Sequence, residues 1–204
     1  MAEQILALPL LILAAGKSRR FGSEDKRFTA LPHGGELINA LVRRGRKAGL
    51  DVYVVLDPAD DVSARIDAPC VFAPNAGVGM GASIADAVGI FAERSEAEAL
   101  LIMPADLPLL RVESLRRVAE PATAQRIVIP TFDAKGGHPI AFGREYWPAL
   151  SKLSGDEGGR SVIASARSEF VDGYPRADVC FAIKASPGAA LRFTPHLIFV
   201  AGGT

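Results

Sequence analysis

An apolar run at residues 8–13 ends directly in a loop of small residues and cations, and this junction most constrains how the chain can fold. The run has the length and composition of one buried strand. The loop begins Ala14-Ala15-Gly16 and carries Arg20, with Lys26 shortly after it. Small residues let a ligand approach the backbone closely, and backbone N–H groups together with these cations can hold a run of phosphates. The junction therefore predicts a strand of a sheet followed by a nucleoside triphosphate site.

Other interpretations of this loop are possible. Gly16-Lys17-Ser18 is similar to the end of a Walker A motif, but that motif requires a glycine five positions before Gly16, where this chain has Leu11 inside the strand. No Gly-x-Gly-x-x-Gly follows the strand, which excludes a dinucleotide fingerprint. The alternative without a ligand is a basic surface turn after a core strand.

Along the rest of the chain, short apolar runs alternate with amphipathic helical patterns, which is typical of an α/β fold. Strands are expected at residues 51–56, 71–72, 99–103, 127–129 and 139–142, with Pro130 ending the fourth. Helices are expected at residues 37–48, from a capping-box-like start at Ser83, from 112, around 146–153 and at 160–168. The alternation predicts a single-domain, three-layer α/β fold whose mostly parallel sheet is covered by helices on both faces. No repeat or linker divides the chain, so we expect one domain over residues 1–204, with an ambiguous tail at 174–204.

Composition excludes several classes of protein. The formal net charge is zero, which argues against nucleic-acid binding, because that depends on a basic face. Two cysteines, Cys70 and Cys180, are too few for a disulfide scaffold. The apolar run that contains Pro9 is too short to span a membrane. The expected location is the cytoplasm.

A second motif, Met103-Pro104-Ala105-Asp106-Leu107-Pro108, also follows an apolar strand. Ligands of parallel sheets bind beyond the carboxyl ends of the strands, so this turn and the Gly16 loop are expected at one edge. A carboxylate placed there can hold Mg²⁺, which bridges phosphate oxygens. The structural alternative is that Asp106 caps a turn before Pro108.

Three other segments carry further candidate residues. Residues 75–83 form a loop rich in glycine that begins with Asn75, contains Gly79 and Gly81, and ends at Ser83. Its glycines would permit backbone hydrogen bonds to a base, and the alternative is a flexible loop with a helix cap. Gly136-Gly137-His138-Pro139 contains a histidine for an acceptor or phosphate, or a structural histidine of a turn. In Leu153-Ser154-Gly155-Asp156-Glu157-Gly158-Gly159-Arg160, Asp156 could bind a metal or cap a helix, and Arg160 could bind a phosphate.

These five segments, taken in chain order over residues 8 to 165, resemble the nucleotidyltransferases that act on molybdenum cofactor, the MobA-like NTP transferases. The resemblance implies a Rossmann-like fold of the nucleotide-diphospho-sugar transferase type and transfer of a nucleoside monophosphate from an NTP to molybdopterin, with release of pyrophosphate. It implies catalytic roles for Arg20, Lys26 and Asp106, with Asp106 as the Mg²⁺ ligand. Nucleotide-binding roles fall to Leu13, Ala14, Ala15, Gly16, Lys26, Asn75, Gly79, Gly81 and Ser83. Acceptor-binding roles fall to His138, Asp156 and Arg160.

The resemblance also leaves choices open. Ala14-Ala15-Gly16 is similar to the form that goes with CTP, whereas the spacing from Gly22 to Lys26 is closer to the GTP branch; CTP is favoured. Many relatives end in an acidic segment that residues 181–188 lack, and the apolar end at 197–200 is either an extra strand or a partner surface. The alternatives are a sugar-phosphate or methylerythritol-phosphate nucleotidyltransferase, and a non-catalytic accessory protein that carries a nucleotide or pterin to a molybdoenzyme.

Overall fold

Strand β1 (Pro9–Leu13) lies in the middle of the sheet, as its apolar sequence predicts. The computed structural model describes residues 8–16, 25–32, 34–132, 135–166, 168–171, 181–184 and 192–195. Strand β1 pairs in parallel with β2 (Asp51–Leu56) on one side and with β4 (Ala99–Pro104) on the other. Parallel strands are joined by helical crossovers, and these helices cover both faces of the sheet. Strand β1 is therefore buried on both faces, which explains its continuous run of apolar residues.

The sheet has the order β3-β2-β1-β4-β7-β5-β6, with β8 paired to β5, and a separate hairpin joins β9 and β10. The remaining strands are β3 (Cys70–Phe72), β5 (Ile127–Phe132), β6 (Lys135–Gly136), β7 (Ile140–Gly143), β8 (Ser168–Val171), β9 (Phe181–Lys184) and β10 (Arg192–Pro195). The helices are α1 (Leu37–Lys47), α2 (Met80–Arg94), α3 (Val112–Ala119), α4 (Trp147–Leu150) and α5 (Arg160–Ser165), with short 3₁₀ turns η1 (Lys26–Phe28), η2 (Ser63–Arg65), η3 (Ala76–Val78) and η4 (Arg144–Tyr146).

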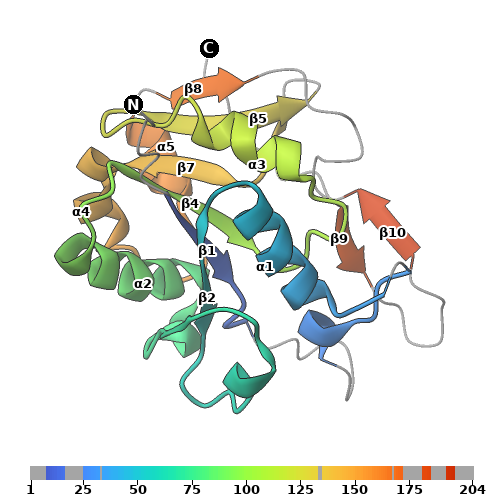
Figure 1. The fold of residues 1–204 in the computed structure, drawn as a ribbon. Helices are drawn as coiled ribbons and strands as arrows, with labels where there is room; N and C mark the ends of the chain where they lie inside the picture. The colour runs from blue at the N-terminus through green and yellow to red at the C-terminus, as the bar shows by residue number, and fades with distance from the viewer. Residues whose placement is uncertain are drawn as a thin grey trace, which may run out of the picture.

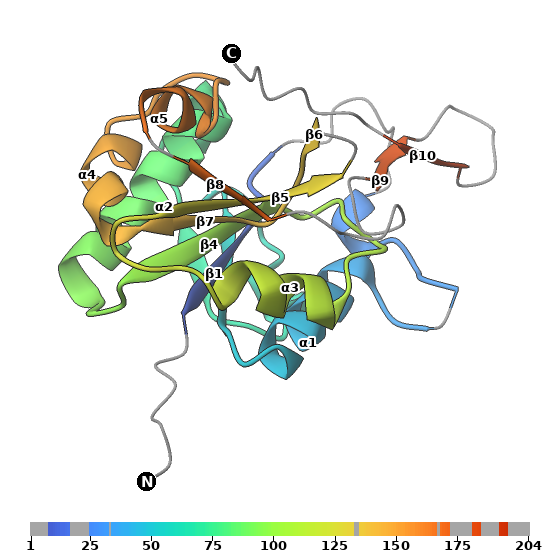
Figure 2. The same cartoon turned by 90° about the horizontal axis from the view of Figure 1, so that it is seen from above.

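Helices cover both faces of the sheet, which confirms the three-layer prediction. Helices α1 and α3 lie on one face, and α2, α4 and α5 lie on the other (Figures 1 and 2). Side chains of β1 alternate between the two cores: Leu10 and Ile12 pack with α1 and α3, and Leu11 packs with α2. Helix α1 approaches the sheet closely at Gly45, where a Cβ atom would lie 2.6 Å from Val52 and 2.8 Å from Leu10.

Three details of the fold differ from the expected pattern. Strand β7 runs antiparallel to β4 and β5, because no helix separates β5 from β7, and without a long crossover the chain must return antiparallel. Strand β5 also continues through Pro130, whose carbonyl still accepts a hydrogen bond from the Gly137 N–H at 2.7 Å. Helix α5 ends at Ser165 rather than 168, because the chain has by then turned into β8. Within the described ranges, no helix combines the length and apolar character needed to cross a bilayer.

Candidate functional site

The carboxyl ends of β1 and β4 lie side by side, which places the two principal sequence motifs at one edge of the sheet. Leu13 pairs with Pro104 in the parallel register. The Ala105 N–H donates to the Leu13 carbonyl at 3.1 Å, and the Ala14 N–H donates to the Val55 carbonyl at 2.9 Å. The Gly16 loop and the turn that carries Asp106 therefore leave the sheet next to each other.

Two cavities open at this edge. The first, here called the glycine cavity, measures about 510 Å³. Half of its lining residues are glycine, alanine or serine, and the full set is Leu13, Ala15, Gly16, Asp57, Ala76, Gly77, Val78, Gly79, Met80, Ser83, Pro104 and Asp156. Exposed backbone beside Ala15 and Gly16 can approach a ligand without steric hindrance, and a Cβ atom built on Gly16 would meet nothing within 4 Å.

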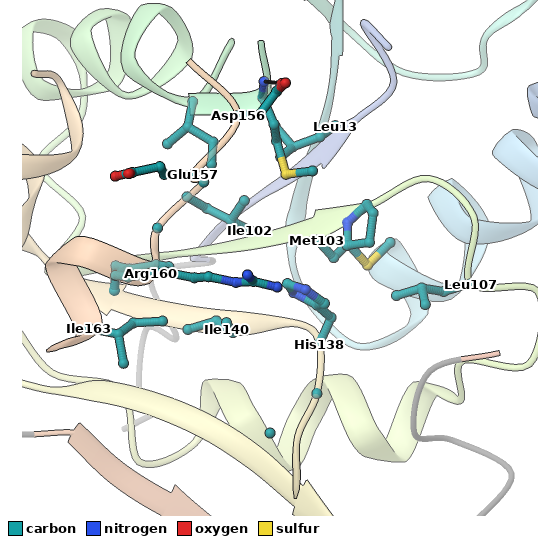
Figure 3. Close-up of a pocket in the computed structure, with 18 of the residues that line it drawn as sticks. Leu13, Ile102, Met103, Leu107, His138, Ile140, Asp156, Glu157, Arg160 and Ile163 are labelled. Atoms are coloured by element: carbon teal, nitrogen blue, oxygen red, sulfur yellow. Dashed lines mark hydrogen bonds between the residues drawn. The ribbon is translucent and has the colours of Figure 1, made fainter. Parts of the chain in front are cut away.

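The second, here called the histidine cavity, measures about 360 Å³ and is mainly apolar (Figure 3). Its apolar wall includes Ile84, Ile102, Leu107, Ile140, Phe142 and Ile163. Its polar side chains are Asp106, His138, Asp156, Glu157 and Arg160. The two cavities share Leu13, Met80, Pro104 and Asp156 as a common wall.

Arg160 reaches across the histidine cavity towards His138, from α5 to the loop before β7 (Figure 3). The pKa of His138 is lowered to about 4, because burial disfavours the imidazolium and the charge of Arg160 repels it, although the Ile102 carbonyl acts in the opposite direction. The buried Nδ1 atom of His138 has no hydrogen-bond partner among the described residues. At neutral pH the cavity thus presents a neutral imidazole and a guanidinium to whatever enters it.

The loop that precedes α2 is locked to the loop that precedes α5. The Gly81 N–H donates to the Gly155 carbonyl at 2.7 Å, and the Met80 N–H donates to Asp156 Oδ1 at 3.4 Å. Gly79 has φ +147°, and a Cβ atom there would lie 2.4 Å from the Gly155 carbonyl oxygen and 2.5 Å from Asp156 Oδ1. Only glycine at position 79 allows the two loops to approach this closely. Asp156, which takes part in this contact, lines both cavities.

Two expected helix caps, Ser83 and Asp156, are not formed as the sequence suggested. Helix α2 begins at Met80, so Ser83 lies inside the helix, where its hydroxyl donates to the Gly79 carbonyl at 3.3 Å instead of capping the helix. Asp86 bonds Asn75, through the backbone N–H at 2.7 Å and the side-chain amide at 2.9 Å, and so stabilises the loop. Asp156 caps neither α5, whose N-cap is Gly159, nor any helix near it in sequence.

The structure brings most of the predicted site residues to the two cavities. Leu13, Ala15, Gly16, Gly79 and Ser83 line the glycine cavity, and Asp106, His138, Asp156 and Arg160 line the histidine cavity. Ala14 is buried beneath the loop, and Gly81 lies against Ser154 and Gly155. Of the described residues predicted to bind nucleotide, Lys26 and Asn75 also line neither cavity. Arg20 lies outside the described residues, as do Cys180 and residues 197–200.

Asp106, the residue expected to bind the metal, lines the histidine cavity. Within the described part of the chain, no three His, Cys, Asp or Glu side chains cluster closely enough to hold a metal ion. Mg²⁺ that enters with a nucleotide is commonly held by one or two carboxylates plus phosphate oxygens, so a strand-end carboxylate such as that of Asp106 fits such an ion.

Two residues of this edge were missed in the sequence. Asp57 directly follows β2, is 9% exposed and lines the glycine cavity. The rule that singled out Asp106, an acid directly after a buried strand, would also have found it. Arg27 donates to the Ala14 carbonyl at 3.0 Å, and nothing in the local sequence separates it from the other cations of the segment.

Comparison with known proteins gives a family and relatives. Residues 10–170 match the family model described as MobA-like NTP transferase domain. The purine catabolism protein PucB of Bacillus subtilis (strain 168) is 31% identical over 170 residues, which cover 77% of this chain and 80% of PucB.

Solved structures share the fold. Rv0371C of Mycobacterium tuberculosis H37Rv, crystallised as a complex with manganese, is 22% identical with a TM-score of 0.64, over 82% of this chain and 89% of that chain. Molybdopterin-guanine dinucleotide biosynthesis protein A of Archaeoglobus fulgidus is 19% identical with a TM-score of 0.60, over 81% of this chain and 83% of that chain.

Proposed function

The chain belongs to the family of MobA-like NTP transferases, and from this premise we propose that it transfers a nucleoside monophosphate from CTP to molybdopterin or its molybdenum-loaded form, releasing pyrophosphate. GTP is the alternative donor. The proposal treats residues 1–204 as one nucleotidyltransferase domain. It rests on one observation above all: two cavities of different chemistry share a wall at Leu13, Met80, Pro104 and Asp156, beside Asp106.

The glycine cavity would hold the nucleotide. Ala15 and Gly16 line this cavity, and the backbone N–H groups of such a loop would suit a polyphosphate, with Arg20 and Lys26 supplying positive charge. Asp57 and the segment from Gly77 to Gly79 offer polar groups and close backbone approach for the nucleobase. In Ala14-Ala15-Gly16, the second alanine rather than a glycine supports CTP over GTP.

The histidine cavity would hold the acceptor. Its apolar wall suits a fused ring better than a polyhydroxylated sugar, which supports a pterin over a sugar phosphate. Arg160 would bind the acceptor phosphate, and neutral His138 would contribute hydrogen bonds without charge. The Archaeoglobus fulgidus protein with this fold bears a name that refers to molybdopterin, in line with this acceptor.

In the proposed reaction an acceptor phosphate oxygen attacks the α-phosphorus of the NTP in line, and pyrophosphate leaves. No covalent enzyme intermediate is required, so the chain contributes positioning and charge rather than a nucleophile. Asp106 would hold Mg²⁺, which when bound neutralises charge on the phosphates. Manganese in the Rv0371C crystal supports a divalent ion for that protein.

A matrix of CTP, GTP, ATP and UTP against molybdopterin, its molybdenum-loaded form, methylerythritol phosphate and a hexose 1-phosphate tests the proposal, with Mg²⁺ present and pyrophosphate as the readout. We expect pyrophosphate from CTP with a pterin acceptor and none from CTP alone. Pyrophosphate only with the sugar phosphates would replace the acceptor assignment. Nucleotide or pterin binding with no pyrophosphate from any pair would identify an accessory carrier for a molybdoenzyme.

A further inference from the structure

Arg27 joins three segments beneath the glycine cavity. Its Nη1 donates to the Ala14 carbonyl at 3.0 Å and to Asp60 Oδ2 at 2.7 Å. Its Nε and Nη2 donate to the carboxylate of Asp25 at 2.6 to 2.9 Å. The side chain is 14% exposed, so these bonds are largely shielded from water.

Both described ends of the first loop meet on this one side chain. Ala14 stands directly before Ala15 and Gly16, which line the glycine cavity, and Asp25 is the first described residue after Gly16. Asp60 is the third partner, and its N–H donates at 2.9 Å to the carbonyl of Asp57, which also lines the cavity. Arg27 therefore connects two segments that line the cavity without lining it itself.

Charge supports this geometry. Burial alone would raise the pKa of Asp25, but the hydrogen bonds and charge of Arg27 lower it. Burial alone would lower the pKa of Arg27, but the hydrogen bonds and charges of Asp25 and Asp60 raise it. The shifts in the pKa values of Asp25 and Arg27 thus both favour the charged form of the side chain. Neutralising two carboxylates beside a polyphosphate site removes repulsion that would otherwise weaken anion binding.

We infer that Arg27 is a positioning residue for the nucleotide: it holds Ala14 and the turn after β2 in the geometry that binds the NTP, and it contributes little to acceptor binding. The inference rests on the proposed function. A planar guanidinium with five N–H groups can bond three partners at once, whereas a lysine ammonium keeps the charge but loses the fork geometry.

The test compares Arg27→Lys with the matched variant Arg65→Lys. Arg65 also makes a 2.6 Å ion pair, with Glu36, and its guanidinium lies 3.6 Å from the Phe28 ring centre next to Arg27, but it lines neither cavity. For each variant we would measure the Kd for CTP and GTP with Mg²⁺, the KM for NTP and acceptor, kcat and the thermal midpoint. Arg27→Lys should weaken NTP binding about tenfold, the loss expected for one charge-assisted hydrogen bond, and leave the acceptor KM within twofold. Arg65→Lys should change neither.

Asp60→Asn provides a second variant if Arg27→Lys does not fold, since it keeps Arg27 and its bond to Ala14 and should weaken NTP binding by a smaller factor. NTP binding in the folded Arg27 variant within twofold of wild type would overturn the inference and leave the proposed function intact. Equal weakening for both substrates would assign Arg27 a general structural role and overturn it as well. Wild-type protein that binds no NTP would overturn the proposed function together with the inference.

Discussion

Asp106 is the single described carboxylate that sequence and structure both place at the end of β4 and in the histidine cavity. If it holds the metal, Asp106→Asn removes charge neutralisation from the transfer step while preserving side-chain shape. Turnover should fall at least about a hundredfold. Pyrophosphate release at saturating substrates measures this, with Asp51→Asn as control, because Asp51 is exposed at the opposite end of the parallel strands. An Asp106 variant with near-normal turnover would remove the metal assignment.

His138 predicts a pH dependence of stability. Its folded pKa of about 4 lies below the ordinary value of 6.5, so between these values the unfolded state binds more protons at this position. The stability that neutral His138 contributes to the folded state is therefore lost as the pH falls from 6.5 to about 4. The free energy of unfolding should drop by up to about 3 kcal/mol over this pH range. Urea unfolding of wild type and His138→Asn at pH 7 and pH 4.5 measures it, since other groups cancel in the comparison. The stability difference between the two proteins should shift against wild type at the lower pH; a constant difference would contradict the burial of a neutral imidazole.

Among the elements, the loop before α2 carries the most exacting contact. Gly79→Ala would place a methyl group 2.4 Å from the Gly155 carbonyl oxygen, at a φ that alanine rarely adopts, and would push the loop of Asp156 off α2. We expect a loss of about 1–3 kcal/mol in the free energy of unfolding and weaker binding of both substrates. Gly77→Ala is the matched control, because Gly77 lines the same cavity and its Cβ would meet nothing within 4 Å. Thermal unfolding and the KM values for both substrates compare the Gly79 variant with the Gly77 variant. Equal effects in the two variants would show that the contact at Gly79 is dispensable.

Much of the element order could be predicted because it follows from local patterns. The apolar run of β1 and the stripe of Leu37, Ile38, Leu41 and Val42 on α1 were predicted from spacing and are buried as expected. The start of α2 was predicted wrongly, because Asp156, a residue 76 positions away, meets its first turn. Strand β5 ran past Pro130 because the proline carbonyl, which local rules ignore, pairs with Gly137.

The candidate site divides in the same way. Residues at strand ends, such as Gly16 and Asp106, were found because the topology of parallel sheets brings strand ends together. The bonds of Arg27 could not be predicted, since its partners come from three separate segments and many cations crowd that part of the sequence. The contact of Asn75 with Asp86 was not predicted, because Asn75 was assigned to nucleotide binding and its partner lies on the following helix.

At the scale of the whole molecule, three carboxylates that line the two cavities differently can test whether each cavity binds one substrate. Asp57 lines the glycine cavity but not the histidine cavity, and Glu157 lines the histidine cavity but not the glycine cavity. Asp156 lines both. If each cavity holds one substrate, Asp57→Asn should change the KM for NTP, and Glu157→Gln should change only the KM for the acceptor. Asp156→Asn should change both, because the ligands share that wall. Steady-state kinetics with each substrate varied in turn gives the KM for NTP and the KM for the acceptor of wild type and of each variant.

The Asp156 variant also bears on coupling between the substrates. A wall touched by both ligands, and tied to the first turn of α2 through Met80, lets one ligand alter the affinity for the other, and any such effect must be equal in both directions. We expect acceptor analogue to change the Kd for NTP severalfold in wild type, and Asp156→Asn to reduce that factor towards one. Titration of each ligand in the presence and absence of the other measures both directions. Independent binding in wild type, or an Asp156 variant that changes the KM of one substrate only, would mean that the shared wall separates the cavities without linking them.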